Sequence, residues 1–313
     1  MIISPFITIL KYVTIRHCPY GHFNVIENRR NKKRVNSISK PTLLKTKSKT
    51  SKTEIIYMKS NIETIMIVFW TGGLDSYLAL LYIMENRLVN NDYHRLYLLT
   101  TVDMDNNMLL YQNIDMKTIM NQVQWMKLDI VVIPLPSAYN NDDYTTQIQC
   151  GINIIKDSIK DEYLKYSIDG PTNIEVKLVF SDLRIDEIKA WKESMFTNHE
   201  LNQSCCFPLF GIDYMVLQEK LMMYRRGSDS GNSNNESSRS TSIALIDDPR
   251  ISSMKYEEII ITNVSEDFKQ NLTIGDKFTS ELVDRVIETS EEKRLLDRFG
   301  QNGEFYTLVT FKL

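Results

Sequence analysis

Short apolar runs alternate with amphipathic stretches from residue 65 onward. The apolar runs have the length of strands and are nearly continuous, as expected where helices cover both faces of a sheet. The intervening stretches carry their apolar residues on one face, as in Leu78, Leu81, Tyr82 and Leu88. This alternation predicts an α/β fold, a three-layer sandwich around a parallel sheet. The predicted strands are 65–70, 96–102, 130–135 and 176–180, and the predicted helices include 186–196 and 214 to about 225.

The pattern is interrupted after residue 225 and then resumes. Residues 227–242 are almost entirely Ser, Asn, Gly and Arg, and none of them could anchor a core, so we predict a low-complexity insertion. A strand-like run covers 256–264, and residues 305–311 alternate as a last strand does. We therefore expect a larger domain over 58–182 and a smaller C-terminal lobe over 183–313.

Residues 1–57 differ from the rest of the chain in charge. They carry twelve Lys or Arg against Glu27 and Glu54, whereas the remainder carries 25 basic against 38 acidic residues. A basic stretch without periodicity predicts a disordered tail, with an organelle transit segment as the alternative. The acidic remainder argues against general nucleic-acid binding, tRNA included, because such a surface needs basic side chains to neutralise phosphates.

No apolar run approaches the roughly 20 residues that span a bilayer, so no membrane association is expected. The four cysteines, Cys18, Cys150, Cys205 and Cys206, have neither the spacing of a zinc site nor that of a disulfide framework. A reducing compartment, the cytoplasm, is therefore the expected location, with organellar targeting by residues 1–57 as the alternative.

The segment TGGLDS, residues 71–76, joins the first predicted strand to the first predicted helix. In an open α/β sheet this is where a ligand binds. Gly72 and Gly73 allow the backbone amides to approach an anion closely, and the helix that follows adds a favourable dipole. The hydroxyls of Thr71 and Ser76 can donate to phosphate oxygens. Asp75 would repel an anion unless it holds a magnesium ion that bridges the phosphates.

The alternative for this segment is a tight turn in which Asp75 caps the helix. The chain has no Walker lysine at the required spacing and no Gly-x-Gly-x-x-Gly segment, which argues against P-loop and dinucleotide sites. The segment instead resembles the SGGxDS signature of pyrophosphatase-loop ATP enzymes, with Thr71 in place of the first serine. Ser181 and Asp182 follow another predicted strand and are expected to face the same crevice, although Asp182 could instead be a helix N-cap.

Two further segments, in the same order along the chain, resemble the diphthine-ammonia ligase family. Residues 179–191, VFSDLRIDEIKAW, followed by residues 207–213, FPLFGID, are similar to that family's VFGD, acidic helix and FPLWGxD stretch. Residues 300–307, GQNGEFYT, are similar to its C-terminal CGENGEFHT block. Together with the loop, these segments extend over nearly the whole folded chain.

The resemblance implies an adenine nucleotide alpha hydrolase-like fold and a ligase reaction. ATP would activate the carboxylate of diphthine, a modified histidine of a translation elongation factor, as an acyl-adenylate with release of pyrophosphate. Ammonia would then displace AMP and leave the diphthamide amide. The reaction needs a cradle for pyrophosphate, magnesium to neutralise charge, and alignment of the carboxylate with the α-phosphate. The implied ligands and partners are ATP, Mg²⁺, free ammonia and the diphthine-bearing elongation factor.

The resemblance also assigns roles to individual residues. The residues expected to bind ATP are Thr71, Gly72, Gly73, Asp75, Ser76, Thr100 and Thr101, the last two on the adenosine. The residues expected to act in catalysis are Asp75, Ser181 and Asp182, with Asp75 as the magnesium ligand. The residues expected to line the diphthine pocket are Asn302, Gly303 and Glu304. There Glu304 would pair with the trimethylammonium group; the alternative for these three is a glycine-rich hairpin turn.

The chain departs from the family pattern at several positions. Leu74 stands where the family usually has Lys, and Phe299, Gln301 and Tyr306 stand for Cys, Glu and His in the C-terminal block. The family's MHG segment has no clear counterpart around residues 108–111. Two alternatives therefore stay open: a related pyrophosphatase-loop ligase that acts on another carboxylate, and a degenerate nucleotide-binding protein without turnover.

Overall fold

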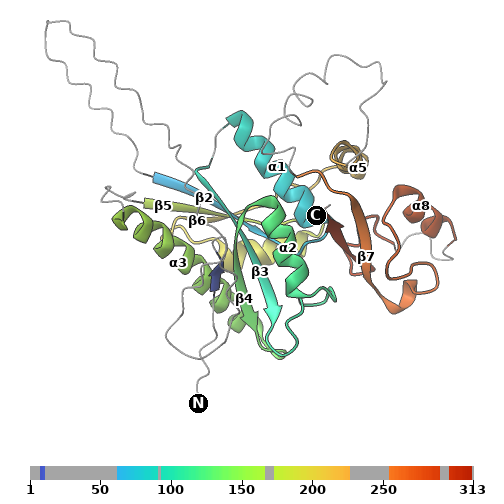
Figure 1. Ribbon diagram of the computed structural model, residues 1–313, viewed down its shortest axis with the longest axis horizontal. Helices are drawn as coiled ribbons and strands as arrows, with labels where there is room; N and C mark the ends of the chain where they lie inside the picture. Colours follow the sequence, from blue (N-terminus) through green and yellow to red (C-terminus); the bar gives the residue numbers. More distant parts are fainter. Residues whose placement is uncertain are drawn as a thin grey trace, which may run out of the picture.

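A computed structural model describes residues 8–10, 62–90, 93–165, 173–225, 254–289 and 296–311 (Figure 1). The expected low-complexity insertion, 227–242, lies outside these ranges. So does the expected tail or transit segment, 1–57, apart from Thr8–Leu10. Those three residues form a short strand, β1, that the apolar pattern did not predict.

The core of the molecule is a six-stranded sheet. Five strands are parallel and β1 pairs antiparallel with β4 at one edge. The strands are, in spatial order, β1 (Thr8–Leu10), β4 (Asp129–Leu135), β3 (Arg95–Asp103), β2 (Ile62–Phe69), β5 (Asn173–Val179) and β6 (Gln203–Cys206). The chain builds outward from β2 through β3 to β4, then crosses back to β5 and β6. The direction of growth therefore reverses between β2 and β5, and ligands bind at the carboxyl ends of strands at such a point.

Helices cover both faces of this sheet, as the apolar pattern predicts. Along β2, Met66 and Val68 pack in one buried cluster with α1 (Leu74–Asn90) and α2 (Met116–Met126). Ile65 and Ile67 point the other way and pack with α3 (Asn141–Lys165) and the end of α4 (Asp186–Phe196). This alternation with period two gives a three-layer α/β arrangement.

The C-terminal residues form a smaller unit on the α1 side of the sheet (Figure 1). Its elements are α5 (Tyr214–Met223), β7 (Glu258–Val264), the 3-10 turn Glu266–Phe268, α8 (Ser280–Thr289) and β8 (Phe305–Thr310). β7 and β8 pair antiparallel, and their inner side, with Ile261 and Phe305, packs on Leu282 and Val286 of α8. Val309 instead belongs to the large buried cluster with α1 and α2. The ribbon is thus attached to the helical layer rather than separate from it.

The four predicted strands are confirmed as the parallel strands β2, β3, β4 and β5, and the helix predicted over 186–196 is α4. The expected boundary at residue 183 does not coincide with a break in the sheet, because α4 and β6 lie beyond it and complete the large sheet and its helical layer. β6 was not predicted, since QSCC is short and only half apolar. None of the helices in the described ranges is long and apolar enough to cross a membrane.

Candidate functional site

The expected phosphate loop leaves β2 at Trp70 and enters α1 at Leu74. Its hydroxyl groups bond to one another: Ser76 Oγ donates to Gly73 O (3.0 Å), and Thr71 Oγ1 donates to Ser76 Oγ (3.2 Å). Ser76 is fully buried, whereas Thr71 is partly exposed. Thr71 is thus accessible to a ligand such as phosphate, whereas the buried Ser76 stabilises the loop through its hydrogen bonds.

Gly72 and Gly73 are required because two other elements approach the loop closely. Gly72 has a φ of +75°, and a Cβ there would lie 2.6 Å from Ile119 Cδ1 of α2. A Cβ on Gly73 would lie 2.8 Å from the backbone oxygen of Thr307 in β8, which cannot turn aside. The glycines therefore let the loop fit between α2 and β8, a constraint that the local sequence did not reveal.

Gln122 of α2 holds this junction together. Its side chain accepts from Trp70 Nε1 (3.0 Å) and donates through Nε2 to Gly72 O (3.0 Å) and Val309 O (2.7 Å). Gly72 O also accepts the backbone N–H of Val309 (2.9 Å). Gln122 is 4% exposed, so these bonds are formed away from water. One amide thus joins the strand end, the loop and β8.

Asp75, in the first turn of α1, is the acidic group of the loop. Its Oδ2 accepts a hydrogen bond from Gln301 Nε2 (2.6 Å), while Oδ1 is buried and has no hydrogen-bond partner among the described residues. Burial, then the carboxylates of Asp297 and Asp182, raise the pKa of Asp75 well above its ordinary value. A carboxylate in this position favours the approach of a proton or a cation.

The C-terminal block presents Gln301 to Asp75. Gln301 Oε1 accepts from the backbone N–H of Leu183 (3.1 Å), in the loop that follows β5. Asp297 fixes the turn before it, because its Oδ1 accepts the backbone N–H groups of Phe299 (2.8 Å) and Gln301 (3.2 Å). Gln301 therefore bridges the phosphate loop and the end of β5. At this position the chain departs from the family pattern.

Glu304 is turned into its own loop. Its Oε1 accepts from Asp297 N (2.8 Å) and Asn302 Nδ2 (3.0 Å), its Oε2 accepts from Asn302 N (2.9 Å), and the residue is 3% exposed. Asn302 is exposed, and Gly303 has a φ of +84°. Substrate binding by Asn302, Gly303 and Glu304 stays a prediction. The hydrogen bonds favour a role for Glu304 in shaping the loop.

Ser181 and Asp182 follow β5, beside the phosphate loop in the sheet order. Both oxygens of Asp182 accept from Lys192 Nζ of α4 (2.8 and 2.6 Å). The same ammonium lies 4.7 Å from the ring centre of Phe180. Asp182 does not cap α4, because the residue at the N-cap position is Ile185, which makes no side-chain cap bond. The carboxylate is instead one half of an ion pair at the strand end.

These strand ends surround an open crevice of about 170 Å³. It brings together residues that are far apart in the sequence and that were each expected to bind ATP or to act in catalysis: Thr71, Thr100, Thr101 and Ser181. Its aromatic wall is formed by Tyr144 and by Phe180, whose ring stacks on Phe69 with centroids 4.3 Å apart. Hydroxyls, aromatic faces and one ammonium thus converge at the point where the strand order reverses.

The sequence analysis missed three residues that organise this site: Gln122, Gln301 and Lys192. Gln122 had a detectable signal, because it lies on the apolar stripe of its helix with Ile119, Val123 and Met126. A buried amide on such a stripe indicates hydrogen bonds to other elements. The contacts of Gln301 and Lys192 depend on how distant segments meet, and their local sequence carries no comparable signal.

Within the described ranges, no group of three or more His, Cys, Asp or Glu side chains is arranged to hold a metal. Mg²⁺ commonly takes one or two protein carboxylates and completes its octahedron with phosphate oxygens and water. Asp75 fits that kind of site in one respect, since its buried Oδ1 has no hydrogen-bond donor among the described residues.

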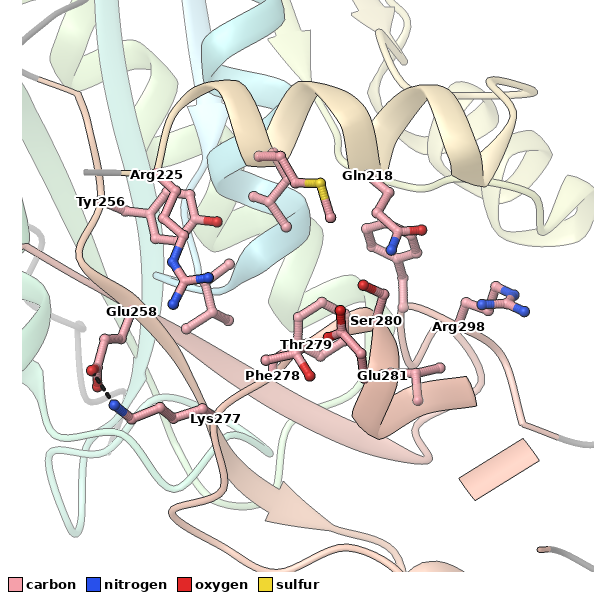
Figure 2. Close-up of a pocket in the computed structure, with 15 residues that line it drawn as sticks. Gln218, Arg225, Tyr256, Glu258, Lys277, Phe278, Thr279, Ser280, Glu281 and Arg298 are labelled. Carbon is pink, nitrogen blue, oxygen red and sulfur yellow. Dashed lines mark hydrogen bonds and ion pairs between the residues drawn. The ribbon is translucent and has the colours of Figure 1, made fainter. Parts of the chain in front are cut away.

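A second cavity, of about 110 Å³, lies between α5, β7 and the start of α8 (Figure 2). Apolar side chains such as Leu221, Phe278 and Phe299 line it, and Glu258 and Lys277 form an ion pair at its border. None of the residues expected to bind ATP, magnesium or diphthine lines this cavity. It is therefore distinct from the crevice at the strand ends.

Comparison with known proteins adds no assignment to this geometry. No protein-family model matches the chain, and no curated protein matches it.

Proposed function

We propose that this protein is an ATP-dependent ligase of the pyrophosphatase-loop kind. It would bind ATP in the crevice at the carboxyl ends of β2, β3 and β5, with an adenine nucleotide alpha hydrolase-like fold. It would form AMP and pyrophosphate while activating a carboxylate for attack by ammonia. The observation that carries the proposal is the meeting of Thr71, Thr100, Thr101 and Ser181 around one crevice at the reversal of strand order.

The residues of the crevice suit the parts of ATP in different ways. Thr71 and the loop amides would hold the pyrophosphate portion at the start of α1. Thr100 and Thr101 would contact the adenosine, and the partly exposed ring of Tyr144 offers an apolar surface for adenine. Mg²⁺ bound at Asp75 would lower the negative charge of the phosphates. No protein nucleophile is required, because the substrate carboxylate attacks the α-phosphorus and pyrophosphate leaves.

The carboxylate itself we take to be diphthine on a translation elongation factor. Its support is the similarity of residues 179–191, 207–213 and 300–307 to the diphthine-ammonia ligase family. The C-terminal block also contacts the loop 71–76, through the bond from Gln301 to Asp75. The substrate is thus expected to enter from the side of this block.

The test is to incubate the full chain with ATP, Mg²⁺ and ammonium, with and without diphthine-bearing elongation factor, and to measure AMP and pyrophosphate. We expect AMP only when both the modified factor and ammonium are present. Asp75→Ala should abolish it. Asp157→Ala is the matched control, because Asp157 is exposed on α3 and pairs only at the surface with Lys160. ADP in place of AMP would contradict the mechanism, and AMP with a different carboxylate would contradict the substrate.

A second candidate, nucleotide binding without turnover, is favoured by one observation. Gln301 holds Asp75 Oδ2 at 2.6 Å, and the raised pKa of Asp75 opposes the charged form that a magnesium ion needs. If this bond persists with ATP bound, the metal does not enter. The outcome that would support this candidate is binding of ATP with no AMP under any condition in the same experiment.

A further inference from the structure

Lys192 has a distinctive place in the crevice. Of the described residues that line it, Lys192 is the only one that carries a charge. The others are hydroxyl, amide, aromatic or aliphatic side chains, among them Thr71, Thr101 and Ser181. Among the described lining residues, its ammonium is thus the one cationic group that an anion in the crevice could bind.

The phosphate loop itself supplies no positive side chain. Residues 71–76 contain neither Lys nor Arg, and Leu74 is fully buried. The carboxylates of Asp297 and Asp182 act on Asp75, and both raise its pKa. A nucleoside triphosphate brought to this loop would find no cationic side chain in it. Its phosphates need a cation that the loop does not provide.

Lys192 can reach such a ligand without any movement of the backbone. Its Nζ pairs with both oxygens of Asp182, at 2.8 and 2.6 Å, and its side chain is 20% exposed. An ammonium on a flexible four-carbon stem can rotate from a carboxylate to a phosphate while α4 stays in place. Asp182 thus holds the cation at the mouth of the crevice.

We propose that Lys192 is the phosphate-binding cation of the nucleotide crevice and that it exchanges its bond to Asp182 for a charge-assisted bond to a phosphate oxygen. This inference rests on the proposed function, because it requires that the crevice bind a nucleotide. It goes further in naming, on α4, a positive group for the phosphates that residues 71–76 do not contain. The ligand class is a nucleoside phosphate, and the base and sugar are not contacted by Lys192.

The test compares the binding of ATP and of adenosine by equilibrium dialysis. Lys192→Met should weaken ATP binding by about tenfold or more, the usual effect of losing a charged hydrogen bond, and change adenosine binding by less than about twofold. Lys192→Arg should keep most of the ATP affinity. Lys189→Met is the matched control: Lys189 lies one turn earlier on α4, over the ring of Phe210, and does not line the crevice. It should bind ATP as the unaltered protein does.

A measurement on the unaltered protein keeps the test valid if Lys192→Met does not fold. An amine-reactive reagent labels lysines, and mass spectrometry reads each position. ATP should protect Lys192 more than adenosine does, with Lys189 unaffected. Equal ATP binding by Lys192→Met, an equal loss of ATP and adenosine binding, or equal protection by the two ligands would overturn the assignment of Lys192 alone. Failure of the unaltered protein to bind any nucleotide would overturn the proposed function with it.

Discussion

Asp75 is a loop residue whose surroundings disfavour the ionised form of its carboxyl group. Its carboxylate is buried, has Gln301 as its one side-chain donor among the described residues, and is acted on by the carboxylates of Asp297 and Asp182. These surroundings raise its pKa, so the folded protein binds this proton more tightly than the unfolded chain does. The free energy of unfolding therefore falls as the pH rises from the unfolded pKa of about 3.9 through the raised folded pKa.

We expect Asp75→Asn to stabilise the protein at neutral and alkaline pH. The amide keeps an acceptor for Gln301 and removes the unfavourable charge, so the free energy of unfolding at about pH 8 should rise by on the order of 1 kcal/mol. The gain should shrink as the pH falls to about 3, below the unfolded pKa of about 3.9, where Asp75 is largely protonated in both states. Urea denaturation at the two pH values, without magnesium, measures this.

Asp157→Asn, at an exposed position, serves as the control and should change stability by no more than about 0.5 kcal/mol at either pH. A loss of stability in Asp75→Asn of equal size at both pH values would mean that shape, not charge, matters at this position. The same variant should lose magnesium-dependent ATP turnover. Stability and activity would then change in opposite directions, as is common for a charged residue held at an active site.

At the scale of elements, the junction of α2, the loop and β8 depends on Gln122. Gln122→Met keeps a similar volume but leaves Trp70 Nε1 and Val309 O without their buried partner. We expect a loss of about 2–4 kcal/mol in the free energy of unfolding, together with weaker ATP binding, because the loop is no longer tied on that side. Gln124→Met, on the exposed face of the same helix, is the control and should be nearly neutral. Equal stability of the two variants would contradict the structural role of Gln122.

The elements that the sequence predicted well are those with a strong local pattern. β2, β3, β4 and β5 are continuous apolar runs, and α4 has a clear apolar face, so each was found within a few residues. β6 was missed because its polar Gln203 and Ser204 interrupt the pattern. The sequence predicted a parallel sheet but not the order of its strands, because strand pairing is decided by long-range packing.

Four residues that line the candidate crevice were predictable from the sequence, but their contacts were not. Thr71, Thr100, Thr101 and Ser181 could be placed because each lies near or just beyond the carboxyl end of a strand, and these ends meet at one edge of a parallel sheet. Glu304 was expected to face a ligand, and its orientation toward Asn302 and Asp297 comes from a turn whose bonds are set by the fold. The position of a residue in the sequence indicates at which edge of the sheet it lies. It does not indicate which groups its side chain will bond to.

At the scale of the whole molecule, β1 protects an edge of the sheet. Thr8–Leu10 pair with residues 130–132 of β4, so a protein begun at Met58 would expose that edge. We expect this shortened protein to self-associate at concentrations where the full chain does not, as measured by sedimentation velocity. Ile9→Pro in the full chain is the matched control, because it disturbs the pairing and removes nothing else, and it should shift in the same direction.

Nucleotide binding should be unchanged within about twofold in the shortened protein, because β4 and β3 separate β1 from β2 in the sheet. A shortened protein that stays monomeric would show that β1 contributes nothing to this edge. A loss of nucleotide binding would mean that residues before Met58 act on the crevice itself.

The hydrogen bonds between β8 and the loop 71–76 also determine when the loop can reach its final structure during synthesis. Leu74 N donates to Thr307 Oγ1 across 233 positions of sequence, and Val309 closes the same junction at Gly72. All six strands of the large sheet have left the ribosome once Cys206 has emerged, but the loop lacks its last supports until the chain has extended past Val309. Early compaction of the sheet must therefore proceed without this junction, and under the proposed function a bound nucleotide would stabilise only the finished protein.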